Sequence, residues 1–153
     1  MADLTPEQVF DRVDAGQSLR GADLRGIDLV FSVLDGADLK RANLQGAQLQ
    51  GAVLQGADLS EADLTAAEFD EAGLLDADLS QATLRKAELT AADLRGANLN
   101  GADLRDAILE DALIDEAQLR QAASLAGATL PDGTKLGKEG WEGEFEAWCR
   151  HQA

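Results

Sequence analysis

Residues 57–76 read ADLSE ADLTA AEFDE AGLLD, which is one five-residue unit written four times in succession. A large apolar residue holds the third place of each copy, at Leu59, Leu64, Phe69 and Leu74. Apolar residues recur about every 3.6 residues in an amphipathic helix and every second residue in a strand, so a period of five fits neither. The chain is therefore expected to turn after each short extended unit.

The same period extends in both directions along the chain. The large apolar residue, called position i, recurs from Leu19 to Leu119 and gives 21 sites, of which 19 are Leu. Alanine stands at i−2 in 18 of these 21 units, and glycine, which accepts positive φ, often stands at i+2. If i−2 and i point inward and i−1 points outward, the residues at i+1 and i+2 can turn a corner. We expect the chain to coil around an interior of Leu and Ala.

These in-register A-(D/N)-L-x-x units resemble the pentapeptide-repeat family, and the resemblance covers residues 17–121. The resemblance implies an all-β fold, a right-handed quadrilateral β-helix with four units in each coil. Twenty-one units would then make about five coils, and a coil spacing of about 4.8 Å gives a rod of about 25 Å.

The segments outside the repeat, residues 1–16 and 122–153, are expected to cap the apolar cross-section and open edges at the two ends of a solenoid. Near the N-terminus, Thr5 is a capping residue, Pro6 suits the first helical position, and Gln8 completes a capping box. The sequence therefore predicts a short capping helix over residues 6–14.

At the other end, the turn motif at residues 130–134 (LPDGT) should end the β-helix. Beyond it Trp141, Phe145 and Trp148 are spaced as i, i+4 and i+7 and would line one face of a capping helix. Two roles remain open for these aromatic residues. They can cap the last coil, or they can form a homodimer contact, because some members of the family pair through C-terminal segments.

The balance of 13 basic against 29 acidic residues gives a net charge of −16. A charge of this sign repels phosphate backbones and anionic lipid heads, so direct binding to nucleic acid is not expected. Neither a signal peptide nor an apolar stretch of about 18 residues, long enough to cross a membrane, can be recognised. We expect a cytoplasmic protein without a membrane association.

Grouping every fourth unit defines four faces, named by their first leucine: face one from Leu19, face two from Leu24, face three from Leu29 and face four from Leu34. Charges balance on faces one and two, whereas face four carries a net charge of −4 and face three a net charge of −7. Face three has no basic residue. Its acidic residues form a candidate partner surface and are Asp28, Glu68, Asp70, Glu71, Glu88, Glu110 and Asp111.

Several positions expected to point outward are apolar. On face four these residues are Val33, Val53, Leu75 and Leu113, and on face three they are Val30, Phe31 and Ile108. One interpretation is an apolar contact patch, with face four as the contact side. The alternative is that the N-terminal helix covers residues 30–33, or that the register shifts locally.

The sequence offers little material for catalysis or for a metal site. His151 is the only histidine and lies two residues from Cys149, the only cysteine, which is poor spacing for a nucleophile and its base. Asp38, Asp58 and Asp78 would lie one coil apart, which favours ladders over a compact calcium cage. The glycines form no phosphate-binding loop. We predict no enzymatic activity, no cofactor and no metal.

The leading hypothesis is a non-catalytic scaffold that presents an acidic, partly apolar surface to a protein partner. One alternative is a DNA mimic that binds gyrase or another topoisomerase, because relatives that protect bacterial DNA gyrase from quinolones are thought to imitate duplex DNA. Faces three and four sum to −11, against roughly 15 phosphates on an equal length of duplex. Those relatives project loops, whereas residues 17–121 contain no insertion. A further alternative is a secretion-associated module, suggested by residues 14–19 (DAGQSL).

Overall fold

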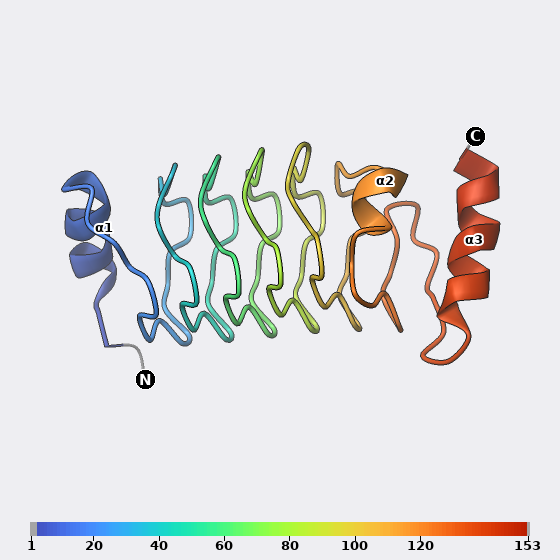
Figure 1. The fold of residues 1–153 in the computed structure, drawn as a ribbon. Coiled ribbons are helices and arrows are strands. Elements are labelled where there is room, and N and C mark those ends of the chain that lie inside the picture. Colours follow the sequence, from blue (N-terminus) through green and yellow to red (C-terminus); the bar gives the residue numbers. More distant parts are fainter. Residues whose placement is uncertain (1–2, 153) are drawn as a thin grey trace.

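The repeat winds into a rod in the computed structural model, which describes residues 3–152 (Figure 1). The side chains at position i from Leu19 to Leu109 are at most 1% exposed and fill the centre of the rod. The alanines at i−2 from Ala37 to Ala112 are also buried. This interior is the Leu and Ala core that the period of five predicts.

Each coil takes twenty residues. Parallel bridges join residues at i−1 to residues twenty positions further along, from Asp23 with Asn43 to Asp93 with Leu113. Each bridge joins one residue of a coil to one residue of the next coil, so each face is a stack of isolated bridges. Every fourth unit therefore lies on the same face, which is the grouping that defines the four faces.

The hydrogen bonds within one unit explain its consensus. In the unit around Leu59, the amides at i−1, i and i+2 donate to backbone carbonyls of neighbouring coils, and the amide of Ala62 donates to the Leu59 carbonyl. The amide of Ser60, at i+1, instead donates to the Asp58 carboxylate at 2.9 Å. Asp or Asn at i−1 is short enough to cap this amide, which gives the repeat a physical reason for that residue.

The corners of the coils use the left-handed region at i+2. Gly56 has φ of 65° there and Glu61 has φ of 60°, so glycine is the unstrained residue at this position. A residue with a Cβ costs about 1–2 kcal/mol in this conformation. The non-glycine residues with positive φ are Phe31, Arg41, Glu61, Ala66, Glu71, Asp76, Gln81, Lys86, Ala91, Asp106 and Asp111.

Helix α1, Pro6–Asp14, lies at one end of the rod and has the bounds predicted from the sequence (Figure 1). The side chains of Thr5 and Gln8 form the expected capping box, and Val9 is buried in the core cluster. The suggestion that this helix covers residues 30–33 is wrong, since Phe31 is 77% exposed and Val33 is 64% exposed.

The last predicted unit, residues 117–121, is not an extended pentapeptide. Helix α2, Glu116–Leu119, forms there, and its Gln118 is buried while Ala117 is exposed, the reverse of the predicted orientation. Asp115 caps the helix, and the Gln118 side-chain amide donates to the carbonyls of Leu94 and Ala97 at 2.6 and 3.0 Å. The side chain of Gln118 thus satisfies backbone carbonyls of the preceding coil.

After α2 the coil resumes with one extra residue. Ser124 pairs with Asp103 and Thr129 with Ile108, each at an offset of 21 residues, and Thr129 also pairs with Lys135 in antiparallel fashion. Helix α3, Trp141–Gln152, then lies across the end of the rod opposite α1 (Figure 1). No helix among residues 3–152 is long and apolar enough to cross a membrane.

Candidate functional site

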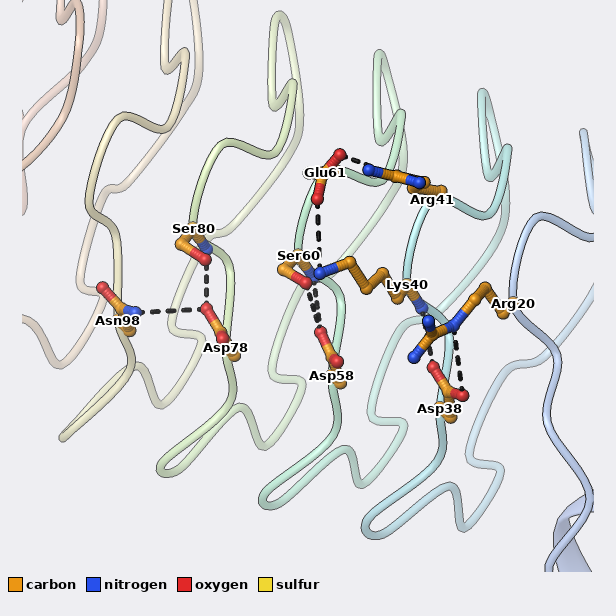
Figure 2. A network of polar contacts seen from close by, with 10 residues as sticks. All are labelled: Arg20, Asp38, Lys40, Arg41, Asp58, Ser60, Glu61, Asp78, Ser80 and Asn98. Atoms are coloured by element: carbon orange, nitrogen blue, oxygen red, sulfur yellow. Dashed lines mark hydrogen bonds and ion pairs between the residues drawn. The ribbon is translucent and has the colours of Figure 1, made fainter.

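The carboxylates of face one are engaged within the molecule (Figure 2). Glu61 pairs with both Lys40 and Arg41 of the preceding coil, at 3.3 and 2.7 Å. Asp38 lies 3.5 Å from Arg20, and Ser18 donates to it at 2.6 Å. The other two carboxylates of face one accept hydrogen bonds along the rod: Asp58 from Ser60, and Asp78 from Ser80 and Asn98.

Faces two and four contain a second arrangement, in which an arginine at i+1 folds back onto the aspartate at i−1 of its own unit. The pairs are Arg25 with Asp23, Arg95 with Asp93, and Arg105 with Asp103. The hydrogen bonds from Arg25 lower the pKa of Asp23 to about 2, and the same contact lowers the pKa of Asp93 and Asp103. These aspartates are held in their charged form by their neighbours.

Face three differs from the other three faces. Within residues 3–152 none of its seven acidic side chains takes part in an ion pair. The bridges align Asp28, Gln48, Glu68 and Glu88 in one column along the rod. Glu68 accepts a hydrogen bond from the neutral side-chain amide of Gln50, which leaves its charge uncompensated. Glu68 and Glu88 are neighbours in this column, whereas the neutral Gln48 separates Asp28 from them. We call the seven acidic residues of this face the acidic strip.

Most of these acidic residues do not serve the repeat. Asp28 caps the amide of Val30 at 3.1 Å, but the longer Glu68 and Glu88 form no such bond to the i+1 amide in the described chain. Four others stand at i+1 or i+2, outside the capping position: Asp70, Glu71, Glu110 and Asp111. The sequence contains a signal that separates carboxylates that cap the i+1 amide from those that do not, since Glu replaces the consensus Asp at residues 68 and 88. Counting charges does not detect this signal.

The predicted apolar surface separates into parts. Val33 and Val53 are bridge partners in adjacent coils and are both exposed. Leu113 is exposed as well, but Gly73 and Asp93 lie between it and Val53 in the same column. The side chain of Leu75 is half-buried. The structure therefore places Val33 and Val53 together with the exposed Phe31, and leaves Leu75 and Leu113 apart from them.

The C-terminal aromatic residues are largely used within the chain. Phe145 and Trp148 are buried and stack at 5.8 Å between ring centroids, and the Trp148 indole donates to Asp132 at 2.8 Å. Trp141 is half-buried against the core. Arg120 lies over the Phe145 ring and pairs with Glu116 and Glu146. These contacts fit the capping role, and the homodimer contact stays a prediction.

The described chain offers no evident reactive centre. Burial raises the pKa of the Cys149 thiol, which disfavours the reactive thiolate. Among residues 3–152 no group of three or more His, Cys, Asp or Glu side chains could hold a metal ion.

A family model described as "Pentapeptide repeats" matches the sequence in eight copies, over residues 18–56, 47–85, 74–111 and 87–123. HetL from the cyanobacterium Nostoc, a pentapeptide repeat protein involved in heterocyst differentiation regulation, is 36% identical, with a TM-score of 0.39. That match covers 78% of this chain and 62% of HetL, so this chain spans less than two thirds of HetL. Such pentapeptide repeat proteins form right-handed β-helices.

Two more solved structures are similar to this chain. A pentapeptide repeat protein from the thylakoid lumen of Arabidopsis thaliana is 30% identical, with a TM-score of 0.39 over 82% of this chain and 87% of that protein. QnrB1, a plasmid-mediated fluoroquinolone resistance protein, is 19% identical, with a TM-score of 0.34 over 90% of both chains. No curated protein gives a significant match.

Proposed function

Because this chain belongs to the pentapeptide-repeat family, we propose that it is a non-catalytic scaffold, a β-helix of about five coils whose face three binds a basic protein. Members of this family are in general non-catalytic scaffolds. The cytoplasmic location expected from the sequence is part of the proposal.

The observation that carries the proposal is the absence of counter-ions on face three within the described residues. On faces one, two and four, lysines and arginines pair with some of the carboxylates at 2.5 to 3.5 Å, namely Asp23, Asp38, Glu61, Asp93 and Asp103. On face three seven carboxylates share one side of the rod, and their mutual repulsion brings the fold no benefit. A partner with a basic surface would relieve this repulsion. Binding such a partner therefore accounts for an arrangement of charges that folding does not explain.

A pull-down with matched charge variants tests the proposal. The face-three variant carries E68Q, D70N, E71Q and E88Q. The control carries D38N, D58N, D78N and D103N and removes the same charge from faces one and two. Asparagine keeps the cap in the control, because Asn43 and Asn98 already cap the amides of Gln45 and Asn100.

We expect at least one basic protein of the source cells to be retained by the unmodified chain and by the control and lost by the face-three variant. Mass spectrometry of the retained fractions gives the comparison. Equal retention by both variants would show that position on the rod does not matter, and that result would reject face three as the binding surface.

A second candidate partner is DNA gyrase or another topoisomerase, with the rod acting as a DNA mimic. The observation that favours it is the column on face three in which Asp28, Glu68 and Glu88 are aligned along the rod without an ion-pair partner in the described chain. Binding should weaken steeply with salt and compete with duplex DNA, since both ligands would use one basic groove. The face-three variant should lose this competition, and a supercoiling assay that the unmodified protein leaves uninhibited would exclude this candidate.

A further inference from the structure

Three consecutive residues at the corner between faces three and four depart from the repeat. Phe31 stands at i+2, where glycine is common, Ser32 stands at i−2 in place of alanine, and Val33 stands at i−1 in place of Asp or Asn. No other corner in residues 17–121 combines departures of these three kinds.

Each departure works against the local fold. Phe31 has φ of 55°, a left-handed conformation that a bulky residue adopts only under strain. The Ser32 hydroxyl is buried and has no hydrogen-bond partner in the described chain. The Val33 side chain cannot cap the amide of Asp35, as an aspartate there would. Residues that depart from local backbone and hydrogen-bonding preferences without stabilising the fold are expected at functional sites.

The same corner exposes an aromatic ring next to the following coil. The Phe31 ring lies over Gly51 of the next coil, where any Cβ would overlap the ring. Since the ring is 77% exposed, it projects from the rod, with Val33 and Val53 beside it. An exposed aromatic side chain is suited to anchor an interface, because it offers a large apolar area and has few rotatable bonds whose freedom is lost when a partner covers it.

The charges around this corner select the kind of partner. Asp28 and Asp35 stand three and four residues from Phe31, and Glu71 stands at the same corner two coils further along. None of the three forms an ion pair in the described chain. A second copy would bring the same negative face, and nucleic acid would be repelled likewise. A cationic surface with an apolar centre complements both features.

We propose that Phe31, with Val33 and Val53, is the apolar anchor at which a cationic amphipathic protein surface docks, while the acidic strip of face three holds its basic residues. The proposal rests on the proposed function, to which it adds the anchor and the amphipathic character of the partner.

Two helical peptides of equal positive charge serve as defined probes, one with leucines along one face among its lysines and one with glutamines in place of those leucines. Titration of the isotope-labelled full chain by NMR measures affinity and location. We expect the Lys/Leu peptide to bind more tightly than the Lys/Gln peptide and to shift the signals of Phe31, Val33, Gly51 and Val53.

The decisive variant is Phe31→Gly, which removes the anchor and places at this corner the residue that its backbone prefers, so its melting temperature should not fall. Its affinity for the Lys/Leu peptide should drop by about tenfold or more, as for an interface hot spot, while the Lys/Gln peptide binds as before. Ala91→Gly is the matched control. Ala91 has φ of 56° at the same corner of a later coil, and its replacement should leave both affinities unchanged.

The outcomes separate the two proposals. If Phe31→Gly binds the Lys/Leu peptide as tightly as the unmodified chain does, the anchor is wrong. In that case, loss of both peptides by the face-three variant would leave the proposed function standing. If the unmodified chain binds neither peptide, the proposed function and the anchor are both rejected.

Discussion

Faces one and three are built from the same five-residue unit over the same leucine core, but they use their carboxylates differently. On face one, Asp58 and Asp78 cap their own turns, and Glu61 holds two basic side chains of the coil before it. On face three, Glu68 and Glu88 cap no turn in the described chain and form no ion pair with a lysine or arginine there. Acidic residues of equal charge therefore have a structural role on face one, whereas Glu68 and Glu88 on face three have none of this kind, which is why we propose that they serve a partner.

The core gives the largest expected effect and should not distinguish the faces. Leu59 lies under face one and Leu89 under face three, and both are at most 1% exposed. Leu59→Ala and Leu89→Ala should each cost about 2–5 kcal/mol, because a stacked column of leucines cannot close around the cavity. Denaturant unfolding measures both values. A clear difference between them would mean that the two sides do not share one core.

The turn caps give the next largest effect and should separate the faces. Asp58→Ala removes an acceptor from the amide and the hydroxyl of Ser60 and should cost about 1 kcal/mol. Glu88→Ala should change stability by no more than about 0.5 kcal/mol. Asp58→Asn is the control that keeps the cap. Equal losses at residues 58 and 88 would contradict the distinction between structural and free carboxylates.

The corners offer a smaller test in which the sign of the change matters. Glu71 and Glu61 have φ of 59° and 60°, so glycine relieves the same strain at both sites. Glu71→Gly on face three should raise stability by about 1 kcal/mol. Glu61→Gly on face one should gain less, because Lys40 and Arg41 lose their partner. Thermal melting of both variants gives the comparison, and a larger gain at residue 61 would refute it.

The smallest effect concerns pH and the arginine pairs. Since Arg25 lowers the pKa of Asp23 from 3.8 to about 2, their pair stabilises the fold above the unfolded pKa. That contribution is lost as the pH falls from 3.8 to about 2. The melting temperature of Arg25→Met should therefore lie below that of the unmodified chain near neutral pH and approach it in this window. A difference that persists in strong acid would show that the carboxylate is not its source.

Much of the fold follows from the sequence because it depends on residues that repeat. Leucine at every fifth position determines what lies inside, and the capping box of Thr5 and Gln8 places α1 without reference to the rest of the chain. Helix α2 could not be predicted in this way. Leu119 keeps the period, but the buried side chain of Gln118 finds its acceptors at Leu94 and Ala97, more than twenty residues away in the sequence.

The candidate surface was predicted only in part for a similar reason. Summing charges along a face finds the acidic strip, since the strip depends on the twenty-residue coil alone. The sum does not tell a carboxylate that caps a turn from one that does not, because that depends on a methylene group and on local geometry. The internal use of Trp148 likewise depends on a contact between residues distant in sequence, whereas the separation of Leu113 from Val53 by Gly73 and Asp93 can be read from the twenty-residue spacing.

The free energy of unfolding of the face-three variant, with E68Q, D70N, E71Q and E88Q, tests the central claim most directly. If these carboxylates serve a partner and not the fold, neutralising them removes mutual repulsion at no structural cost. Denaturant unfolding should then give a stability equal to or above that of the unmodified chain. A loss of more than about 1 kcal/mol, the size of a turn cap, would show that the acidic strip belongs to the structure and would contradict its assignment to a partner.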